Sequence, residues 1–357
     1  MVVPLQIAAA LRERGYQAET WFLYRFAPAF ENEPGVRVIL PRNVRGLLDY
    51  VRIFLRLVPA MRAFRPDAVH GALPLGNVLG LLAAAVIRCP SRVASQHSPA
   101  ATHNIVMQWL DKAWGSVGIY TANIAVSNSV YESYESYPRP YVRRLRVVQN
   151  GIRARPPSRT KAAAREHFGL PADARLIGSL GRLAQEKNQS FLVDVLARLP
   201  DAHLALAGDG ELRPRIEQQA RAMGLAARVH LLGAVPPEDV ADFLHTLDIF
   251  VLPSRFEGLP IALVEAMQAG LPVVVSDIPS TLEVVSTDDG GTAGLVLETR
   301  SAESWAAAIR DLFATPGKLR ALGEKARRRG GDFSLERMVD GYVACLFPDS
   351  SPSSTRR

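Results

Sequence analysis

Short apolar segments alternate with helical patterns through residues 175–277, and this alternation constrains the fold more than any other feature of the chain. The apolar segments are RLIGSLGRL (175–183), HLALAGDG (203–210), VHLLGAV (229–235), IFVLPS (249–254) and PVVVSD (272–277). Each of the first four is followed by a segment with helical spacing, namely SFLVDVLARL, ELRPRIEQQARAMG, PEDVADFLHTL and IALVEAMQAG. Strands rich in Val, Ile and Leu that are joined by helices form parallel sheets with helices on both faces. The C-terminal half is therefore predicted to be a doubly wound α/β domain that binds ligands at the carboxyl edge of its sheet.

The N-terminal half shows the same pattern with less regularity. Its strand-like segments are QAETWFLYRF, VRVIL, DAVHGALP, SRVASQH, IAVSNS and LRVVQNG. A linker is expected around residues 149–160, where QNG is followed by RARPPSRT. A length of 357 residues suits two domains. We therefore predict two Rossmann-like domains that face a cleft, residues 1–152 and 153–346, followed by a disordered tail at 347–357.

The start of the chain does not fit a complete doubly wound domain. PLQIAAALRERGY (4–16) reads as an amphipathic helix that stops at Gly15, and a strand follows it directly. In such a domain a central strand should precede this helix, but only Met-Val-Val does. A missing strand would leave buried backbone groups unpaired. The expectation is that the first strand and its Gly-rich loop are absent because the start of the sequence was set too late.

Charge is distributed unevenly along the chain. Residues 1–155 hold 19 Lys and Arg against 9 Asp and Glu, whereas the remainder holds 23 against 26. The basic half is the one expected to meet an anionic partner, unless its arginine content reflects genomic composition. Within it, residues 42–65 combine six arginines with Leu, Ile, Phe and Val. A helix of this kind suits an anionic membrane surface, and the alternative is a helix packed on the sheet with a basic outer face.

Other bulk features bear on the compartment. The two cysteines, Cys89 and Cys345, form no metal or redox motif, which favours a reduced, cytoplasmic protein. The longest apolar run, residues 75–87, is too short to span a bilayer. A cytoplasmic protein, peripheral at the inner face of the membrane, is the expected localisation. No nucleic acid partner and no cofactor are expected.

The segment EGLPIALVE (257–265) places two glutamates eight positions apart around the start of a predicted helix. Pro260 suits the first helical turn, and Gly258 allows a tight turn with close backbone approach. Glu265 is five residues beyond Pro260 and would therefore lie roughly 7–8 Å further along the helix axis than Pro260. The helix start offers a partial positive charge for phosphate, and the two carboxylates can accept hydroxyls. The structural alternative is that Glu265 caps a buried network and Glu257 is solvated.

The loop GRLAQEKN (181–188) follows the first strand of the C-terminal domain and carries Arg182 and Lys187. Two cations at the carboxyl edge of a strand make a clamp for a diphosphate, although charged loops are also commonly just solvated. AGDG (207–210) resembles part of a dinucleotide fingerprint, but the glycine spacing fails at Arg213. A dehydrogenase is therefore a poor interpretation.

Taken together, these motifs resemble the retaining glycosyltransferases of the large family four, which have the GT-B fold. The resemblance covers nearly the whole chain: VVQNGI (147–152), GRLAQEKN, AGDGELR (207–213), LLGAV (231–235) and PSRFEGLPIALVEAMQAGLPVVVSD (253–277). It implies an enzyme that moves a sugar from a nucleoside diphosphate-sugar to an acceptor hydroxyl with retention. It also implies that no metal is needed, because fixed cations and a helix terminus can replace a divalent ion. A lipid-linked acceptor, as in cell-surface polysaccharide or glycolipid synthesis, would suit the basic N-terminal half.

The resemblance implies roles by position. Arg182 and Lys187 would bind the donor diphosphate and stabilise the leaving group. Glu257 would hold hydroxyls of the donor sugar, and Glu265 those of the ribose. The remaining donor-binding residues would be Leu232, Gly233, Gly258, Leu259 and Pro260, largely through their backbones.

In the N-terminal half the candidates are fewer. His97 stands at the end of a predicted strand, where family members often place a histidine that reaches the donor sugar; a structural role is an equal alternative. His70 is a weaker candidate for the acceptor side, and Ser127 is expected to be structural. Two other functions stay open: a non-catalytic GT-B binding or scaffold protein, and a nucleotide-sugar epimerase. The epimerase would need more carboxylates and histidines than the predicted site offers.

Overall fold

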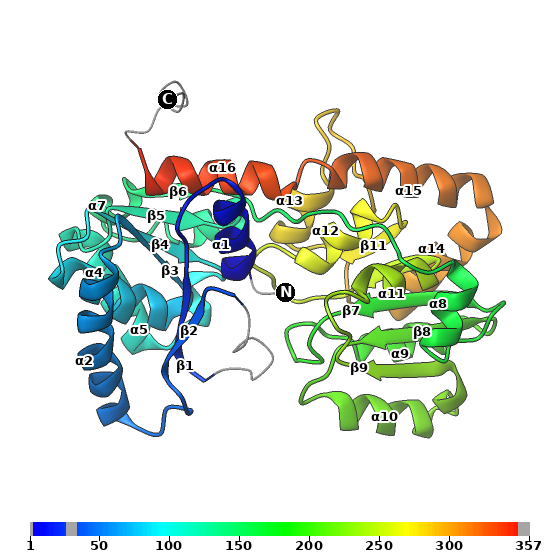
Figure 1. Ribbon diagram of the computed structural model, residues 1–357. Coiled ribbons are helices and arrows are strands. Elements are labelled where there is room, and N and C mark those ends of the chain that lie inside the picture. The colour runs from blue at the N-terminus through cyan, green and yellow to red at the C-terminus, as the bar shows by residue number, and fades with distance from the viewer. Residues whose placement is uncertain (1–2, 26–33, 349–357) are drawn as a thin grey trace. The chain divides into compact units, whose positions relative to one another are not determined.

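The computed structural model describes residues 3–25 and 34–348 of the chain (Figure 1). It divides into two compact units, one made of residues 1–150 and 336–357 and the other of residues 151–335. The named strands of both units pair in parallel in the part of the chain that is described. The predicted α/β class with two Rossmann-like domains is confirmed.

The N-terminal unit follows the predicted order of elements. Its helices and strands are α1 (Val3–Glu13), β1 (Thr20–Tyr24), β2 (Val36–Leu40), α2 (Leu47–Phe64), β3 (Ala68–Ala72), α3 (Leu73–Leu75), η2 (Gly76–Gly80), α4 (Leu81–Val86), β4 (Ser91–Gln96), η3 (Ala100–Thr102), α5 (Ile105–Val117), β5 (Ala122–Ala125), α6 (Asn128–Ser133), α7 (Arg139–Val142), β6 (Leu145–Val147) and α16 (Leu335–Leu346). The predicted first helix is present as α1, and Gly15 after it adopts the left-handed conformation with φ of 86°.

The strands of this unit form two sheets. One is the pair β1–β2, and the other has the order β3-β4-β5-β6. Within the described ranges, no strand pairs with both β1 and β3.

The C-terminal helix returns to the N-terminal unit. The side chain of Arg14 donates to Asp340 Oδ1 at 2.6 Å, and the ring of Tyr342 packs edge-on against His70. The predicted C-terminal domain, 153–346, includes this helix, whereas the observed C-terminal unit ends at residue 335. The predicted disordered tail lies outside the described residues from position 349 on, while Phe347 stacks on Tyr16 with ring centroids 5.3 Å apart.

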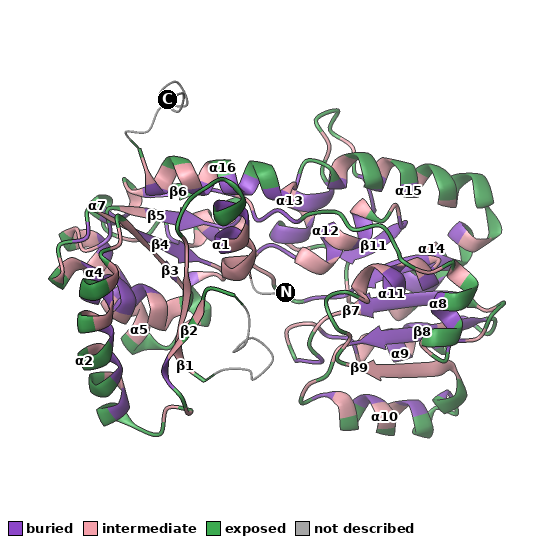
Figure 2. Ribbon diagram, in the orientation of Figure 1, coloured by how far each residue is buried: buried purple, intermediate pink, exposed green. Residues whose placement is uncertain are grey.

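The C-terminal unit contains one six-stranded parallel sheet of order β12-β11-β10-β7-β8-β9. Its elements are α8 (Lys161–His167), β7 (Arg175–Leu180), α9 (Phe191–Leu196), β8 (Ala202–Ala207), α10 (Arg213–Ala222), η4 (Ala226–Arg228), β9 (Val229–Gly233), α11 (Val240–Thr246), β10 (Ile249–Leu252), α12 (Ile261–Gln268), β11 (Val273–Ser276), α13 (Pro279–Val285), β12 (Leu295–Leu297), α14 (Ala302–Ala314) and α15 (Pro316–Gly330). Strands β10 and β11 are buried along their whole length. Strand β9 at the edge is half-buried (Figure 2). The order reverses at β7, which places the loop after β7 at the switch point where doubly wound sheets bind ligands.

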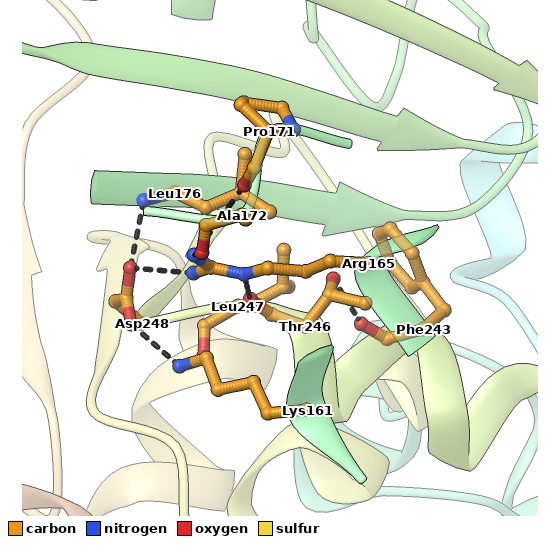
Figure 3. Close-up of polar contacts among 9 residues, drawn as sticks. All are labelled: Lys161, Arg165, Pro171, Ala172, Leu176, Phe243, Thr246, Leu247 and Asp248. Atoms are coloured by element: carbon orange, nitrogen blue, oxygen red, sulfur yellow. Dashed lines mark hydrogen bonds and ion pairs between the residues drawn. The ribbon is translucent and has the colours of Figure 1, made fainter. Parts of the chain in front are cut away.

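A partly buried ion cluster lies at the amino end of this sheet (Figure 3). Arg165 on α8 is 4% exposed; its Nη2 lies 3.2 Å from Asp248 Oδ2, and its Nε donates to the Thr246 carbonyl at 3.0 Å. Asp248 also accepts from Lys161 Nζ at 2.6 Å and from the Leu176 amide at 2.8 Å. A buried guanidinium is tolerated only when it is paired and hydrogen-bonded, as here. The cluster ties α8 to β7 and β10 away from the carboxyl edge.

One further property of the helices concerns membranes. Among the residues that the structure describes, no helix is both long enough and apolar enough to cross a bilayer.

Candidate functional site

The loop between β7 and α9 is held by hydrogen bonds to two neighbouring strands. The amide of Gly181 donates to the Ala207 carbonyl at 2.8 Å, and the amide of Leu183 to the Asp209 carbonyl at 3.0 Å. At its other end, Asn188 Nδ2 donates to the Pro253 carbonyl at 3.2 Å. The loop that carries Arg182 and Lys187 is therefore anchored to the carboxyl ends of both β8 and β10.

Glycines of the predicted AGDG turn make this anchoring feasible. A Cβ on Gly208 would lie 2.0 Å from the Gly181 carbonyl oxygen, and one on Gly210 would lie 2.4 Å from that of Leu183. Gly208 also has φ of 133°, a conformation that disfavours any residue with a side chain. These close contacts support the structural role expected for the turn.

Glu257 is half-buried, with most of its side chain covered, and it is paired. Its side chain is 9% exposed, and Lys187 Nζ donates to its Oε1 and Oε2 at 2.7 and 2.8 Å. Ser254 Oγ donates to Oε1 at 2.7 Å, and the Ser254 carbonyl accepts from Ser276 Oγ at 2.6 Å. The alternative of a solvated Glu257 is wrong. Lys187 and Ser254 fix the orientation of the carboxylate.

Helix α12 begins at Ile261, and Pro260 is its N-cap with φ of −74°. Pro260 thus lies just before the first helical turn rather than within it. Leu259 is buried beside it, 6% exposed. These residues connect the Glu257 carboxylate to the start of α12, where helix termini favour anions.

Glu265 lies on the second turn of α12 and is half-buried. Burial raises the pKa of this carboxyl to about 6. No side chain or backbone group in the described ranges donates a hydrogen bond to it. The alternative that Glu265 caps a buried network therefore has no support in the described contacts. A half-buried carboxylate of this kind can accept two hydroxyls of a ligand.

Arg182 is more exposed than Lys187. Its side chain is 62% exposed, it forms an ion pair with Glu186, and its Nη1 lies 3.6 Å from Glu211 Oε2. Leu232 and Gly233 end strand β9, and the Gly233 carbonyl accepts from the Gly208 amide at 2.7 Å. Three adjacent strand ends therefore bring the Arg182 loop and the β9 end to one edge of the sheet.

In the N-terminal unit, His97 directly follows β4, as predicted. Its Nε2 lies 2.9 Å from Ser95 Oγ, and the same oxygen lies 2.8 Å from Nε2 of His70 on β3. Burial lowers the pKa of His97 to about 4 and that of His70 to about 3. Both rings are therefore neutral near pH 7. The structure joins two candidates that the sequence could only name separately.

Ser127 has a structural contact, in keeping with its expected role. It is the N-cap of α6, and its Oγ accepts from the Val130 amide at 3.1 Å. In the described part of the chain, no three His, Cys, Asp or Glu side chains gather as a set that could hold a metal ion.

Sequence reasoning missed Ser254 and Ser95. Ser254 stands three residues before Glu257 at the end of a predicted strand, and a small hydroxyl residue at that position is the signal that could have indicated it. Ser95 lies two residues before His97, so the two side chains share one face of the strand.

Comparison with known proteins identifies the family of this chain. Residues 2–155 match the sequence model of the Glycosyltransferase Family 4, and residues 160–329 match that of the Glycosyl transferases group 1. The lipopolysaccharide core biosynthesis glycosyltransferase LpsE of Rhizobium meliloti is 31% identical over 57% of this chain, a match that spans 58% of LpsE. A D-inositol 3-phosphate glycosyltransferase of Thermobispora bispora is 27% identical over 96% of this chain and 89% of its own length.

Solved structures show the same fold. HepE of Anabaena, solved in complex with UDP and glucose, has a TM-score of 0.82 at 19% identity and covers 97% of this chain and 96% of its own. The chain therefore belongs to the GT-B glycosyltransferases of the family-4 type.

Proposed function

We propose that the protein is a retaining glycosyltransferase that transfers a sugar from a nucleoside diphosphate-sugar to an acceptor hydroxyl. The observation that carries this proposal is the buried Glu257 carboxylate, which Lys187 and Ser254 orient at the carboxyl edge of β7 and β10. An oriented, acceptor-only group suits the hydroxyls of a sugar. The Lys187 ammonium beside it suits the adjoining phosphate.

The other donor contacts follow from the same edge of the sheet. Arg182 and Lys187 would neutralise the diphosphate as it leaves. Gly258, Leu259 and Pro260 would lie beside it just before α12, and the start of that helix would add a partial positive charge. Glu265 would accept the ribose hydroxyls. Leu232 and Gly233 would contact the base through their backbones. With two cations and a helix start facing the diphosphate, we propose that transfer does not need a metal ion.

The relatives suggest the setting of the reaction. LpsE is named for lipopolysaccharide core biosynthesis, and a relative from Bacillus subtilis, TuaC, for teichuronic acid biosynthesis. The HepE complexes contain UDP-glucose or UDP with glucose. We propose a nucleotide-sugar donor and an acceptor in cell-surface polysaccharide or glycolipid synthesis, with a lipid-linked sugar as the acceptor.

Helix α2 supports a site of action at the membrane surface. It buries Ile53, Leu57 and Met61 and leaves one outward face apolar. That face consists of Leu47, Leu48, Val51 and Leu55, which are 50–80% exposed. Arg52, 57% exposed, flanks it. Arg56 and Arg62 are also exposed on this helix, so its outer face is both apolar and basic. Exposed leucines with arginines beside them suit an anionic interface, and we propose a cytoplasmic enzyme that is peripheral at the inner membrane face.

A donor panel tests the proposed activity. The purified full chain is incubated with UDP-, GDP- and ADP-sugars, with and without EDTA, and release of the nucleoside diphosphate is measured. We expect slow hydrolysis of one donor, unaffected by EDTA, with release of the sugar in the donor's anomeric configuration by NMR. Binding of a donor without turnover would favour the scaffold alternative. Conversion of the donor to an isomeric nucleotide sugar would favour the epimerase.

A further inference from the structure

Three polar atoms lie at hydrogen-bond distance from one serine hydroxyl in the N-terminal unit, and the Tyr342 hydroxyl is a more distant neighbour. Ser95 Oγ lies 3.1 Å from the Gly71 carbonyl oxygen, 2.8 Å from His70 Nε2 and 2.9 Å from His97 Nε2. Ser95 itself is fully buried. Each of these distances is that of a hydrogen bond, and each hydrogen bond needs one proton.

The number of available protons decides which atom donates. A carbonyl can only accept, so the Gly71 contact must use the single proton of Ser95. The hydroxyl oxygen then has two lone pairs left for the two histidines. All three hydrogen bonds form at the same time only if each ring carries its proton on Nε2 and donates it to Ser95. If Ser95 instead donated to either ring, the 3.1 Å contact with Gly71 would join two oxygens without a proton between them.

The position of Ser95 is fixed by its surroundings. Asn77, 1% exposed, donates from Nδ2 to the Ser95 carbonyl at 3.0 Å and accepts from the Ser95 amide at 3.3 Å. The next residue, Gln96, donates to Asp111 Oδ1 at 3.0 Å and accepts from Tyr134 Oη at 3.1 Å. Hydrogen bonds thus hold the backbone of Ser95 and the side chain of Gln96, the last two residues of β4 before His97.

The remaining nitrogen of His97 is then an acceptor. With Nε2 protonated and the ring neutral, Nδ1 carries a lone pair, and it has no hydrogen-bond partner among the described residues. His97 lies at the carboxyl end of β4, the edge where parallel sheets place their ligands. His70 is enclosed more tightly, with Tyr342 edge-on at 5.0 Å.

We propose that Ser95 is a positioning residue that holds His70 and His97 as Nε2–H tautomers, so that His97 presents Nδ1 as a hydrogen-bond acceptor to a substrate hydroxyl. The role of His97 toward substrate rests on the proposed glycosyl transfer. The assignment of the tautomers rests only on the contacts of Ser95 and is independent of that function. His97 in this state can accept from a sugar hydroxyl but cannot donate a proton to a leaving group.

The tautomers can be measured without activity. The full chain is labelled with ¹⁵N-histidine, and long-range ¹H–¹⁵N correlation spectra at neutral pH identify the protonated nitrogen of each ring. His70→Gln and His97→Gln assign the two signals. We expect both rings to be protonated on Nε2 in the wild-type protein. A wild-type His97 protonated on Nδ1, or charged, would overturn the proposal whatever the variants do.

Variants then test whether Ser95 causes this state. Ser95→Ala should leave His97 in a mixture of tautomers and lower kcat/KM by roughly tenfold, the loss of about one hydrogen bond. Ser95→Thr keeps the hydroxyl and should restore the single tautomer. Ser91→Ala is the matched control, because its Oγ on the same strand is buried and unpartnered among the described residues. An unchanged His97 spectrum in Ser95→Ala would contradict the role of Ser95. Absence of transfer with every donor would overturn the proposed function but leave the tautomer result intact.

Discussion

The ammonium of Lys187 lies 2.7 and 2.8 Å from the two carboxylate oxygens of Glu257, although 70 residues separate them in the chain. The pair joins the loop after β7 to the loop after β10. Because the Glu257 side chain is only 9% exposed, solvent and salt screen this ion pair little. In the proposed function the same two groups bind adjoining parts of the donor, so the ion pair orders the site before the donor arrives.

Removing one partner should destabilise the unliganded protein. Lys187→Met leaves the Glu257 carboxylate buried without a cation, and we expect the free energy of unfolding to fall by about 1–3 kcal/mol. Adding Glu257→Gln removes the charge that was left unpaired. The double variant should therefore recover much of the loss in a denaturant titration. An additive loss in the double variant would show that the pair does not matter for stability.

The Ser254 hydroxyl should matter more than a buried hydroxyl without a partner. Ser254→Ala removes the 2.7 Å hydrogen bond to Glu257 and should cost about 1 kcal/mol in stability, with a several-fold lower transfer rate. Ser179→Ala is the matched control, because Ser179 Oγ on β7 is buried with no hydrogen-bond partner in the described residues. Equal effects of the two substitutions on stability and on rate would contradict the orienting role of Ser254.

Glu265 predicts a specific dependence on pH. Burial raises the pKa of Glu265 to about 6, above its value in the unfolded chain. As the pH rises from the unfolded-chain pKa to the folded one and beyond, ionisation of this carboxyl lowers the free energy of unfolding. Glu265→Gln should therefore raise the Tm of the unliganded protein at about pH 8 and change it little near pH 4. The same substitution should weaken donor binding, and wild-type affinity should fall as the pH drops below about 6. Calorimetry in both pH ranges measures these effects; a lower Tm at pH 8 would contradict them.

The outward face of α2 should govern binding to anionic vesicles. Leu48→Ser with Leu55→Ser removes two exposed leucines, 70% and 66% exposed, without touching the buried face. We expect wild-type protein to co-sediment with vesicles of phosphatidylglycerol and phosphatidylcholine at low salt, and less so as salt rises. The double variant should bind several-fold more weakly. Met223→Ser, an exposed apolar residue of the other unit, should bind like wild type; absence of wild-type binding at low salt would dispose of the membrane proposal.

Much of the fold could be predicted because it rests on local patterns. Every strand-like segment named in the sequence overlaps a strand, although β5 begins two residues before the predicted IAVSNS segment. Val, Ile and Leu runs between helical segments have few other stable arrangements. The position of α16 could not be predicted in this way. An amphipathic helix at the end of a chain does not reveal which core its apolar face will join.

The site shows the same limit at the level of side chains. The sequence brings Lys187 and Glu257 to one edge of a sheet, but strand order alone does not say that their charged atoms meet. Likewise, the spacing of two residues places Ser95 on β4 and His97 just after it on the same side of the chain. The contact with His70 depends on the register between β3 and β4, in which Ala72 lies opposite Ser95. Register between strands is set by packing, which no single segment encodes.

In the proposed function Lys187 and Glu257 hold a nucleotide-sugar donor, and calorimetric titration with the active donor and with its nucleoside diphosphate measures this binding. With Lys187→Met we predict a loss of roughly tenfold or more in affinity for both ligands, because a charge-assisted contact to phosphate disappears. With Glu257→Gln we predict near wild-type affinity for the nucleoside diphosphate and a marked loss for the sugar-bearing donor. Wild-type affinity of both variants for both ligands would contradict the account.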